Sequence, residues 1–526
     1  MRVRPLALIL AAATSASAAA RAQDHQHTAA ELGTVTFPTS CNAEAQAQMN
    51  RAVAMLHSFW FPEARRTFET VLTADASCTI AHWGIALTHF SNPMAGGSVP
   101  GTQGPGWAAA QAGLSRPPRD EHERAYISAA ADLFRDYATT PNRPRMLAYE
   151  RALKAIVDAY PQDIEAAVFH GIFVVANSPP DDLTFAQQKR AADALTRLYR
   201  EHPNHPGLAH YIIHAFDSPP LASLALDAAK QYAGIAPAAP HAQHMPSHIF
   251  TRLGLWNESI RANRRSADLE PTPGGKSHPL DYLVYAYLQQ GRDDMALRAI
   301  EEIGGNITGE YMAGALGSYN ALAMPARFAL EREDWKAASA LTVTTTAPSA
   351  EAVTHFAKGL GAIRAGDIPQ AKRSLAELER LAAALKAQND PQWTPVVDAQ
   401  RMAVSAWVAH AEGRHAEALQ LARAAADREE QVEKHPVTPG PLIPSRELLG
   451  DILMVHNQPA AALEAYESTL KKEPNRLRTL LGAARAAKAA GRDAVARQHY
   501  AALVALIDPQ SARPALREAK AAAGGA

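Results

Sequence analysis

The chain has 526 residues, too many for one ordinary hydrophobic core, so we expect several domains or a repeat array. Its 52 basic and 53 acidic residues leave a net charge of −1 without a polybasic run, which argues against nucleic acid or an anionic membrane as the main partner. Aromatic residues make up only 6% and alanine is abundant, a composition typical of closely packed helices.

The first 22 residues have the organisation of a secretory signal peptide. Arg2 and Arg4 form a basic start, residues 6–13 are apolar, and the Ala-Arg-Ala triplet at 20–22 provides a cleavage site. No later segment has about 18 uncharged apolar residues, so we expect no membrane anchor. The sequence therefore predicts an exported protein, periplasmic or secreted, whose mature chain begins with an N-terminal segment at 23–43.

The chain has two cysteines, Cys41 and Cys78, each directly ahead of a helical segment. In the oxidising compartment that export implies, this pair predicts a single disulfide. The alternative is two free, buried thiols, because spacing alone does not determine the distance between the Cα atoms. Neither cysteine lies in a CxxC motif or near a histidine pair, so we do not expect them to bind a metal.

Helical periodicity continues to about residue 510, and no alternating β-branched run occurs. Segments of 12–15 residues come in pairs joined by short turns. Three of these turns place a glycine five residues before an alanine of the second helix: GRDDMA (291–296), GDIPQA (366–371) and GRHAEA (413–418). The pattern predicts a series of helical hairpins.

These hairpins resemble the tetratricopeptide repeat (TPR) family, most clearly at FWFPEARRTF (59–68), YLVYAYLQQGRDDMAL (282–297), AWVAHAEGRHAEAL (406–419) and LLGDILMVHNQPAAALEAY (448–466). The resemblance implies an all-α, right-handed superhelical solenoid of helix-turn-helix repeats with a ligand-binding concave groove. We expect histidine-rich repeats at 44–270 with a Pro/Gly loop at 91–118, further repeats at 271–345, C-terminal repeats at 346–510 and a tail at 511–526. A second Pro/Gly-rich stretch, 270–279, predicts a break between repeats.

The histidines follow the repeat. PGLAHYIIHAF (206–216) and PHAQHMPSHIF (240–250) match with a spacing of 34 residues, so His210 is predicted beside His244 and His214 beside His248. Histidines at i and i+4 lie on one helix face, about 5–6 Å apart at Cβ. Pro246 lies between His244 and His248, so that helix must begin or bend there.

Two further register shifts extend these rows in both directions. They place His170 and Asp281 in the row of His210 and His244. The TPR resemblance implies that this row lines the concave groove.

We therefore predict a histidine-rich metal site in the groove, since imidazole is the commonest metal ligand and suits zinc or copper. The central ligands are His210, His214, His244 and His248, and the alternates are His241, His278, His205, His170 and Asp281. The alternative is a set of histidines that bond the backbone or bind a peptide. Without an HExxH motif hydrolysis is not implied, and no catalytic residue is predicted.

Other histidines carry weaker signals. His82 and His89 share a helix face with Met94 nearby, which favours either a second copper-type site or a packed core face. His57 is expected in the core or a turn, and His435, His456 and His499 are expected to be scattered and solvated. Two functions follow: a metal-binding solenoid, which would be a metalloenzyme if its metal is catalytic, or a metal-free adaptor that holds a peptide or protein in its groove.

Overall fold

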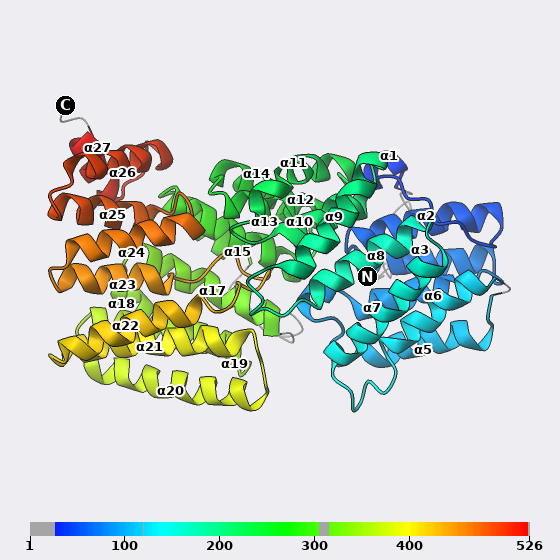
Figure 1. The fold of residues 1–526 in the computed structure, drawn as a ribbon, viewed down its shortest axis with the longest axis horizontal. Coiled ribbons are helices and arrows are strands. Elements are labelled where there is room, and N and C mark those ends of the chain that lie inside the picture. Colours follow the sequence, from blue (N-terminus) through cyan, green and yellow to red (C-terminus); the bar gives the residue numbers. More distant parts are fainter. Residues whose placement is uncertain (1–26, 119, 304–314, 524–526) are drawn as a thin grey trace, which may run out of the picture.

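The computed structural model describes residues 27–118, 120–303 and 315–523, and the predicted signal peptide at 1–22 lies outside them. The described residues form helices and connecting turns, with no strand among them. The predicted all-α solenoid of helix-turn-helix repeats is confirmed (Figure 1). No helix in these residues is long and apolar enough to cross a membrane.

The N-terminal part contains the helices α1 (Ala29–Leu32), α2 (Ala43–His57), α3 (Phe61–Ala74), α4 (Ala81–Phe90), η1 (Pro93–Ala95), α5 (Gln103–Ser115), α6 (Glu121–Asp132), α7 (Asn142–Ala159), α8 (Ile164–Ala176) and α9 (Ala186–Glu201). The middle part contains α10 (Pro206–Phe216), η2 (Ala222–Ala225), α11 (Leu226–Ile235), α12 (Pro240–His244), α13 (Pro246–Arg252), α14 (Trp256–Leu269), α15 (Pro273–Gln289), α16 (Asp293–Glu302) and α17 (Ala315–Glu331). The C-terminal part contains α18 (Trp335–Ser339), α19 (Pro348–Arg364), α20 (Ile368–Ala387), α21 (Trp393–Ala411), α22 (His415–Glu429), α23 (Ser445–Val455), α24 (Pro459–Lys472), α25 (Leu477–Ala489), α26 (Asp493–Leu506) and α27 (Pro514–Ala523).

The hairpin turns have the backbone conformation that their glycines allow. Gly291, Gly366, Gly413 and Gly491 all have positive φ, between 66° and 87°, where a residue with a side chain is strained. Buried alanines then let the paired helices approach closely, and Ala296 of α16 is fully buried against its neighbours. The predicted turn pattern is confirmed at these positions.

The C-terminal helices stack in sequence order from α20 to α27, and they also pack against the middle of the chain (Figure 1). The indole Nε1 of Trp256 in α14 donates to the Asn475 carbonyl at 2.8 Å, and the amide of Leu477 donates to Oε1 of Gln289 at 2.9 Å. These bonds join residues about 190 to 220 positions apart. The C-terminal repeats are therefore tied to the helices that carry the histidines.

Three predicted irregular segments are partly helical. The loop predicted at 91–118 contains α5, where Pro105 lies in the first turn and costs no hydrogen bond. The break predicted at 270–279 is short, because α15 starts at Pro273 and continues through Pro279. The predicted tail contains α27, which packs on α26. Each of these helices has a proline in its first turn, where the backbone N–H groups have no intrahelical partner.

The sulfur atoms of Cys41 and Cys78 are joined in a disulfide, and their Cα atoms lie 4.9 Å apart. Cys78 is buried and Cys41 packs at the edge of the same core. The bond links the segment before α2 to the segment before α4. The alternative of two free thiols is not what the structure shows.

Candidate metal centre

Six histidines from three neighbouring hairpins form one cluster, in which four are buried and His241 and His278 are partly buried. They divide into two groups of three, and in each group one nitrogen from every ring lies within 4.8 Å of the others. We call His210, His214 and His241 triad A, and His244, His248 and His278 triad B. The ring centroids of His214 and His248 are 6.0 Å apart, so the two triads adjoin.

Local sequence explains how the helices present these rings. His210 and His214 lie one turn apart on α10, with ring centroids 4.7 Å apart. Pro246 starts α13 as its first residue, and Met245 keeps helical dihedral angles, so α12 and α13 run on in nearly one line. The i,i+4 pair of His244 and His248 is therefore preserved, with ring centroids 4.9 Å apart.

Triad A has ring nitrogens without hydrogen-bond partners. Nδ1 of His210 lies 2.6 Å from the carbonyl oxygen of His57 and must donate to it, which leaves the Nε2 lone pair of His210 free. Both ring nitrogens of His214 and Nε2 of His241 are also buried without a partner. Buried polar atoms are nearly always satisfied, so these nitrogens are available to a ligand or to water.

Triad B is oriented from outside by two acceptors. Nδ1 of His244 lies 2.6 Å from Oδ1 of Asn263, and Nδ1 of His248 lies 2.8 Å from Oδ2 of Asp217. Asn263 donates its own Nδ2 to the Ser259 carbonyl at 2.8 Å, so its Oδ1 is an acceptor. Each Nδ1 is then protonated, and each neutral ring presents an Nε2 lone pair.

The two Nε2 atoms of His244 and His248 are 2.9 Å apart. Two lone pairs at this distance repel each other unless a proton or a cation lies between them. A metal ion with nitrogen bonds of about 2.0–2.1 Å would accept both. Nδ1 of His278, whose ring centroid lies 4.3 Å from that of His244, is buried without a partner and can supply the third bond.

The surroundings keep these imidazoles neutral. Burial lowers the pKa of every histidine in both triads, and the neighbouring imidazoles lower it further for His210, His214, His241, His244 and His278. Burial alone would raise the pKa of Asp217, but Lys434, Arg252 and His248 outweigh it and hold that pKa well below its ordinary value. Neutral imidazole beside a fixed carboxylate is the form that binds a metal ion.

A loop of the C-terminal repeats contacts the residues around the histidines. Residues 430–444 between α22 and α23, which we call the crossing loop, run over this part of the structure. Nζ of Lys434 lies 3.4 Å from Asp217, and Glu433 pairs with Arg252 at 2.7 Å. The hydroxyl of Tyr282 donates to the carbonyls of Pro436 and Thr438, each at 3.2 Å. The repeat pattern of the sequence carries no signal for these contacts.

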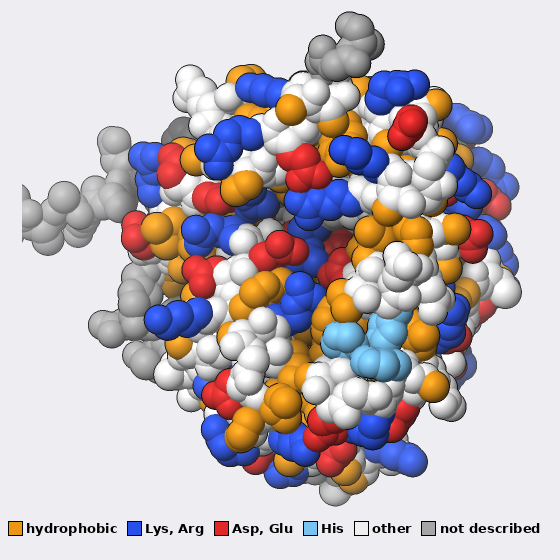
Figure 2. Space-filling model, turned by 90° about the vertical axis from the view of Figure 1, so that its left-hand side faces the viewer, with side chains coloured by type: hydrophobic (Ala, Val, Ile, Leu, Met, Phe, Trp, Pro, Cys, Tyr) orange, Lys and Arg blue, Asp and Glu red, His pale blue; other side chains and the backbone are white. Residues whose placement is uncertain are grey.

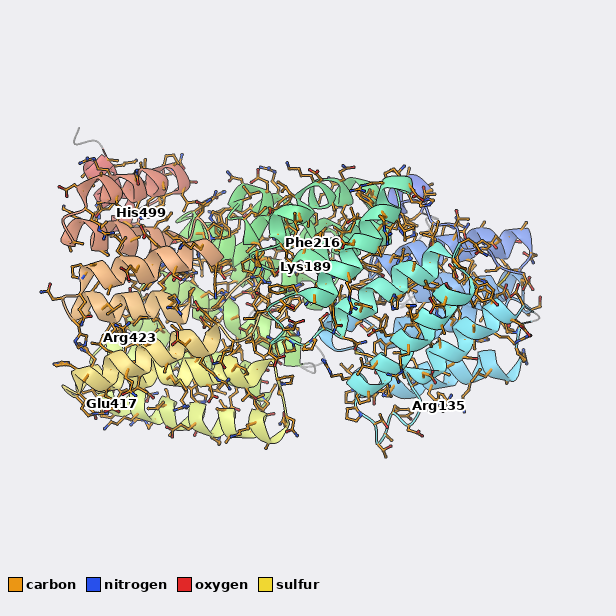
Figure 3. The ribbon with its side chains drawn as sticks, in the orientation of Figure 1. Arg135, Lys189, Phe216, Glu417, Arg423 and His499 are labelled. Carbon is orange, nitrogen blue, oxygen red and sulfur yellow. A yellow bond between two sulfur atoms is a disulfide. The ribbon has the colours of Figure 1, made fainter. Side chains whose placement is uncertain are left out.

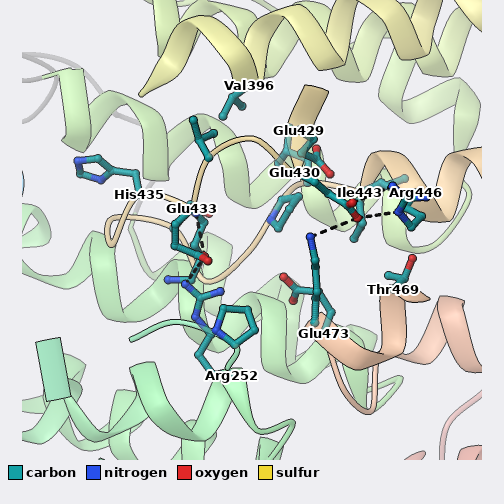
Figure 4. A pocket seen from close by; sticks show the side chains of 18 of the residues that line it. Arg252, Val396, Glu429, Glu430, Glu433, His435, Ile443, Arg446, Thr469 and Glu473 are labelled. Atoms are coloured by element: carbon teal, nitrogen blue, oxygen red, sulfur yellow. Dashed lines mark hydrogen bonds and ion pairs between the residues drawn. The ribbon is translucent and has the colours of Figure 1, made fainter. Parts of the chain in front are cut away.

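Two cavities border the crossing loop. One, of about 300 Å³, is lined by His214, Asp217, Asn177 and Lys434, so triad A is reachable from it. The other, of about 430 Å³, lies between the loop and α19, α21 and α24, with Glu433, Glu429 and Arg446 among its walls (Figure 4). Both cavities share walls at Phe185 and residues 433–435.

Three predicted alternates lie outside the cluster. Asp281 pairs with Arg327 at 3.1 Å, both fully buried, and burial raises the pKa of Asp281 to about 6. His170 is partly buried and lies near Lys154 and Asp158. The register shift that aligned it with His210 therefore does not describe the packing. His205 donates to Glu165 at 2.9 Å.

The Glu165 group is satisfied within itself. His57 also donates to Glu165, at 2.6 Å, and both imidazoles together hold the pKa of that buried carboxylate at about 2. The expectation that His57 lies in the core is confirmed, since its side chain is fully buried. This group therefore supports triad A through the His57 carbonyl, and the ring nitrogens of His57 and His205 are all hydrogen-bonded.

The weaker histidine predictions have mixed outcomes. His89 lies 3.1 Å from Nη1 of Arg65, and neither His89 nor His82 joins a ligand group among the described residues. The expectation that His435 is scattered and solvated is wrong, because it stacks on Trp393 and lines both cavities. His456 is not scattered either, because it meets His410 and His415.

No protein-family model and no curated protein matches the chain. Among solved structures, yeast Tom70 is 8% identical over 91% of this chain and 95% of its own, with a TM-score of 0.35. The human IFIT1 dimer with PPP-AAAA is 11% identical over 89% and 91%, with a TM-score of 0.38. The P58(IPK) TPR domain is 17% identical over 68% and 98%, with a TM-score of 0.21. Likenesses this distant carry no conclusion about ligand or activity.

Proposed function

We propose that the chain is a transition-metal protein in which triad A and triad B each bind one ion, copper or zinc. One observation carries the proposal: buried imidazole nitrogens converge without partners, while the opposite nitrogens of His210, His244 and His248 are held by oxygen acceptors. Fixing one ring nitrogen so that the other can bind is the usual outer arrangement of a histidine metal site. Only histidines are offered, which suits these two metals.

The proposed centre has open coordination positions. Three imidazoles leave at least the fourth position of a tetrahedral ion free, as in catalytic metal sites. His214 borders the cavity of about 300 Å³, so a small molecule entering there could reach the ion of triad A. The arrangement supports metal-assisted hydrolysis or oxidation, and the metal content decides which of these is chemically accessible.

Export is part of the same proposal. The pattern at 1–22 predicts a cleaved signal peptide, and the disulfide between Cys41 and Cys78 fits an oxidising compartment. The exported protein would be periplasmic or secreted.

Metal analysis of protein purified without a histidine tag tests the centre. We expect His214→Ala to contain about one equivalent less copper or zinc than wild type, with unchanged circular dichroism. His499→Ala, a change on α26 remote from the cluster, should keep the full content (Figure 3). A chelator should lower the melting temperature of wild type by more than that of His214→Ala/His248→Ala. If wild type neither contains nor takes up zinc, copper, iron or nickel, the metal function is ruled out.

A second candidate function is a metal-free adaptor for a peptide or protein. The observation that favours it is the cavity of about 430 Å³, whose walls include the apolar side chains of Tyr319, Phe356 and Trp393 (Figure 4). In this case a partner captured from an extract of exported proteins should be retained by chelated protein and by His214→Ala. Trp393→Ala should no longer bind this partner. Capture that depends on His214 would contradict the adaptor function.

A further inference from the structure

A third group of histidines lies on the surface of the C-terminal repeats, far along the chain from the proposed centre. His410 is in the last turn of α21, His415 opens α22, and His456 caps the end of α23. We call these three residues triad C. Figure 2 shows histidine side chains gathered in one surface patch at this end of the molecule.

The three rings are close enough to share one ion. One nitrogen from each lies within 4.8 Å of the others, and the ring centroids are 4.9 to 5.5 Å apart. Nδ1 of His410 and Nε2 of His456 are 3.1 Å apart. In the described residues no carboxylate forms an ion pair with any of the three, so their nitrogens are not committed to an acid.

A second group of possible metal ligands on the surface differs from triad C because an arginine already pairs with it. Glu351, His355 and Glu377 also lie within ligand distance of one another, but Arg380 pairs with both carboxylates, at 2.6 and 2.8 Å. A cation already occupies that group. At triad C the neighbouring cations have other partners: Arg414 is engaged by Glu412 and Glu417, and Arg364 lies over the Trp407 ring at 4.2 Å.

The residues of triad C lie at the turns between paired helices. Gly413, with φ of 77°, reverses the chain so that His410 and His415 meet across a three-residue connection. His456 comes from the corresponding turn of the next hairpin, before Asn457 with φ of 55°. The carboxyl ends of α21 and α23 both point here, and the negative end of a helix dipole favours a cation.

We propose that triad C is a separate surface metal site that binds one zinc ion through His410, His415 and His456, with water as the remaining ligand. The ion would join two consecutive hairpins, α21–α22 and α23–α24, at their turns. Zinc fits because it accepts three imidazoles and a water in tetrahedral geometry without redox chemistry. The proposal does not depend on a metal in triads A and B.

The test is a Zn²⁺ titration of the full, untagged chain after chelation, in competition with a chromogenic chelator. We expect wild type to bind one more zinc ion than His415→Ala, with at least tenfold weaker binding at this site in the variant. His415 is exposed, so the substitution should leave folding intact. His456→Gln should reproduce the loss, and His499→Ala should match wild type.

Two further measurements separate this site from the buried centre. Zinc should raise the melting temperature of His214→Ala/His248→Ala, whose buried site is disabled, and should not raise that of the same variant carrying His415→Ala. Untagged wild type should also be retained on a zinc-chelate resin and His415→Ala should elute early. Equal zinc stoichiometry and affinity in wild type and His415→Ala would overturn the proposal, whatever the buried centre binds.

Discussion

Nε2 of His244 lies 2.9 Å from Nε2 of His248, although Nδ1 of His244 is committed to Asn263. The two rings are thus directed at each other by contacts on their far sides. Asn263 is therefore a positioning residue for triad B. Replacing its side chain should change metal binding, although Asn263 would not contact the ion itself.

We expect Asn263→Leu to weaken metal binding by about 10- to 100-fold, because Nδ1 of His244 loses its acceptor and the ring loses its fixed tautomer. Competition titrations against a chelator series would measure this. Ser266→Ala, a buried change on the same helix, controls for general disturbance of α14 and should bind like wild type. Unchanged affinity in Asn263→Leu would show that Asn263 does not position His244.

The repeat packing makes a second prediction, about stability. Ala296 is fully buried where α16 packs in its hairpin, whereas Leu297 next to it is 42% exposed. Ala296→Glu should lower the free energy of unfolding by about 3–5 kcal/mol, because it buries a charge in a close helix contact. Leu297→Glu should change it by less than about 0.5 kcal/mol. Denaturant unfolding followed by circular dichroism would compare them, and equal midpoints would contradict the packing.

The disulfide should stabilise the N-terminal repeats. It closes a loop of 37 residues, for which the chain-entropy model gives about 3–4 kcal/mol. Cys41→Ser/Cys78→Ser should therefore unfold at clearly lower denaturant concentration than wild type. Thiol titration of denatured, unreduced wild type should find no free thiol, and two reactive thiols would refute the bond.

The last prediction concerns pH. Burial raises the pKa of Glu429 to about 7, from an ordinary value of 4.5, although Ser445 donates two hydrogen bonds to this carboxyl group. Between these two pH values the folded protein holds a proton that the unfolded chain releases. The stabilisation is complete below pH 4.5 and is lost as the pH rises through 7.

Glu429→Gln should not show this loss of folding stability at rising pH. Relative to the variant, metal-free wild type should become less stable by roughly 1 kcal/mol between pH 5 and 8, a modest figure because the side chain is partly accessible. Urea unfolding at several pH values gives the comparison. Parallel stability curves for the two proteins would show that Glu429 does not titrate in this range.

The sequence was most informative where residues repeat. Gly291 and its equivalents could be identified as turns because their spacing recurs, and His214 could be placed beside His248 because both follow the same 34-residue spacing. The ring of His210 packs against that of His241, at 5.0 Å between centroids, a contact that the 34-residue spacing did not predict.

The residues that orient the cluster carry no such signal. Asn263 and Asp217 each accept a hydrogen bond from one histidine of triad B, and neither belongs to the repeat pattern. Lys434, which contacts Asp217, lies in a loop more than 200 residues further along the chain. Burial is the main cause of the lowered pKa values of His210 and His214, ahead of the neighbouring imidazoles, and burial depends on how the solenoid folds back. Contacts between distant repeats cannot be derived from periodicity alone.

The crossing loop has a consequence for the order of assembly. All six histidines of triads A and B precede residue 279, whereas the segment that covers them begins at residue 430. During folding from the N-terminus, the cluster forms while its cover is still missing. An ion that arrives at this stage meets open histidines, and one that arrives later at triad B must displace contacts such as those of Lys434 and Tyr282. Metal taken up early would then be held kinetically, and its identity would reflect the compartment in which the chain folds.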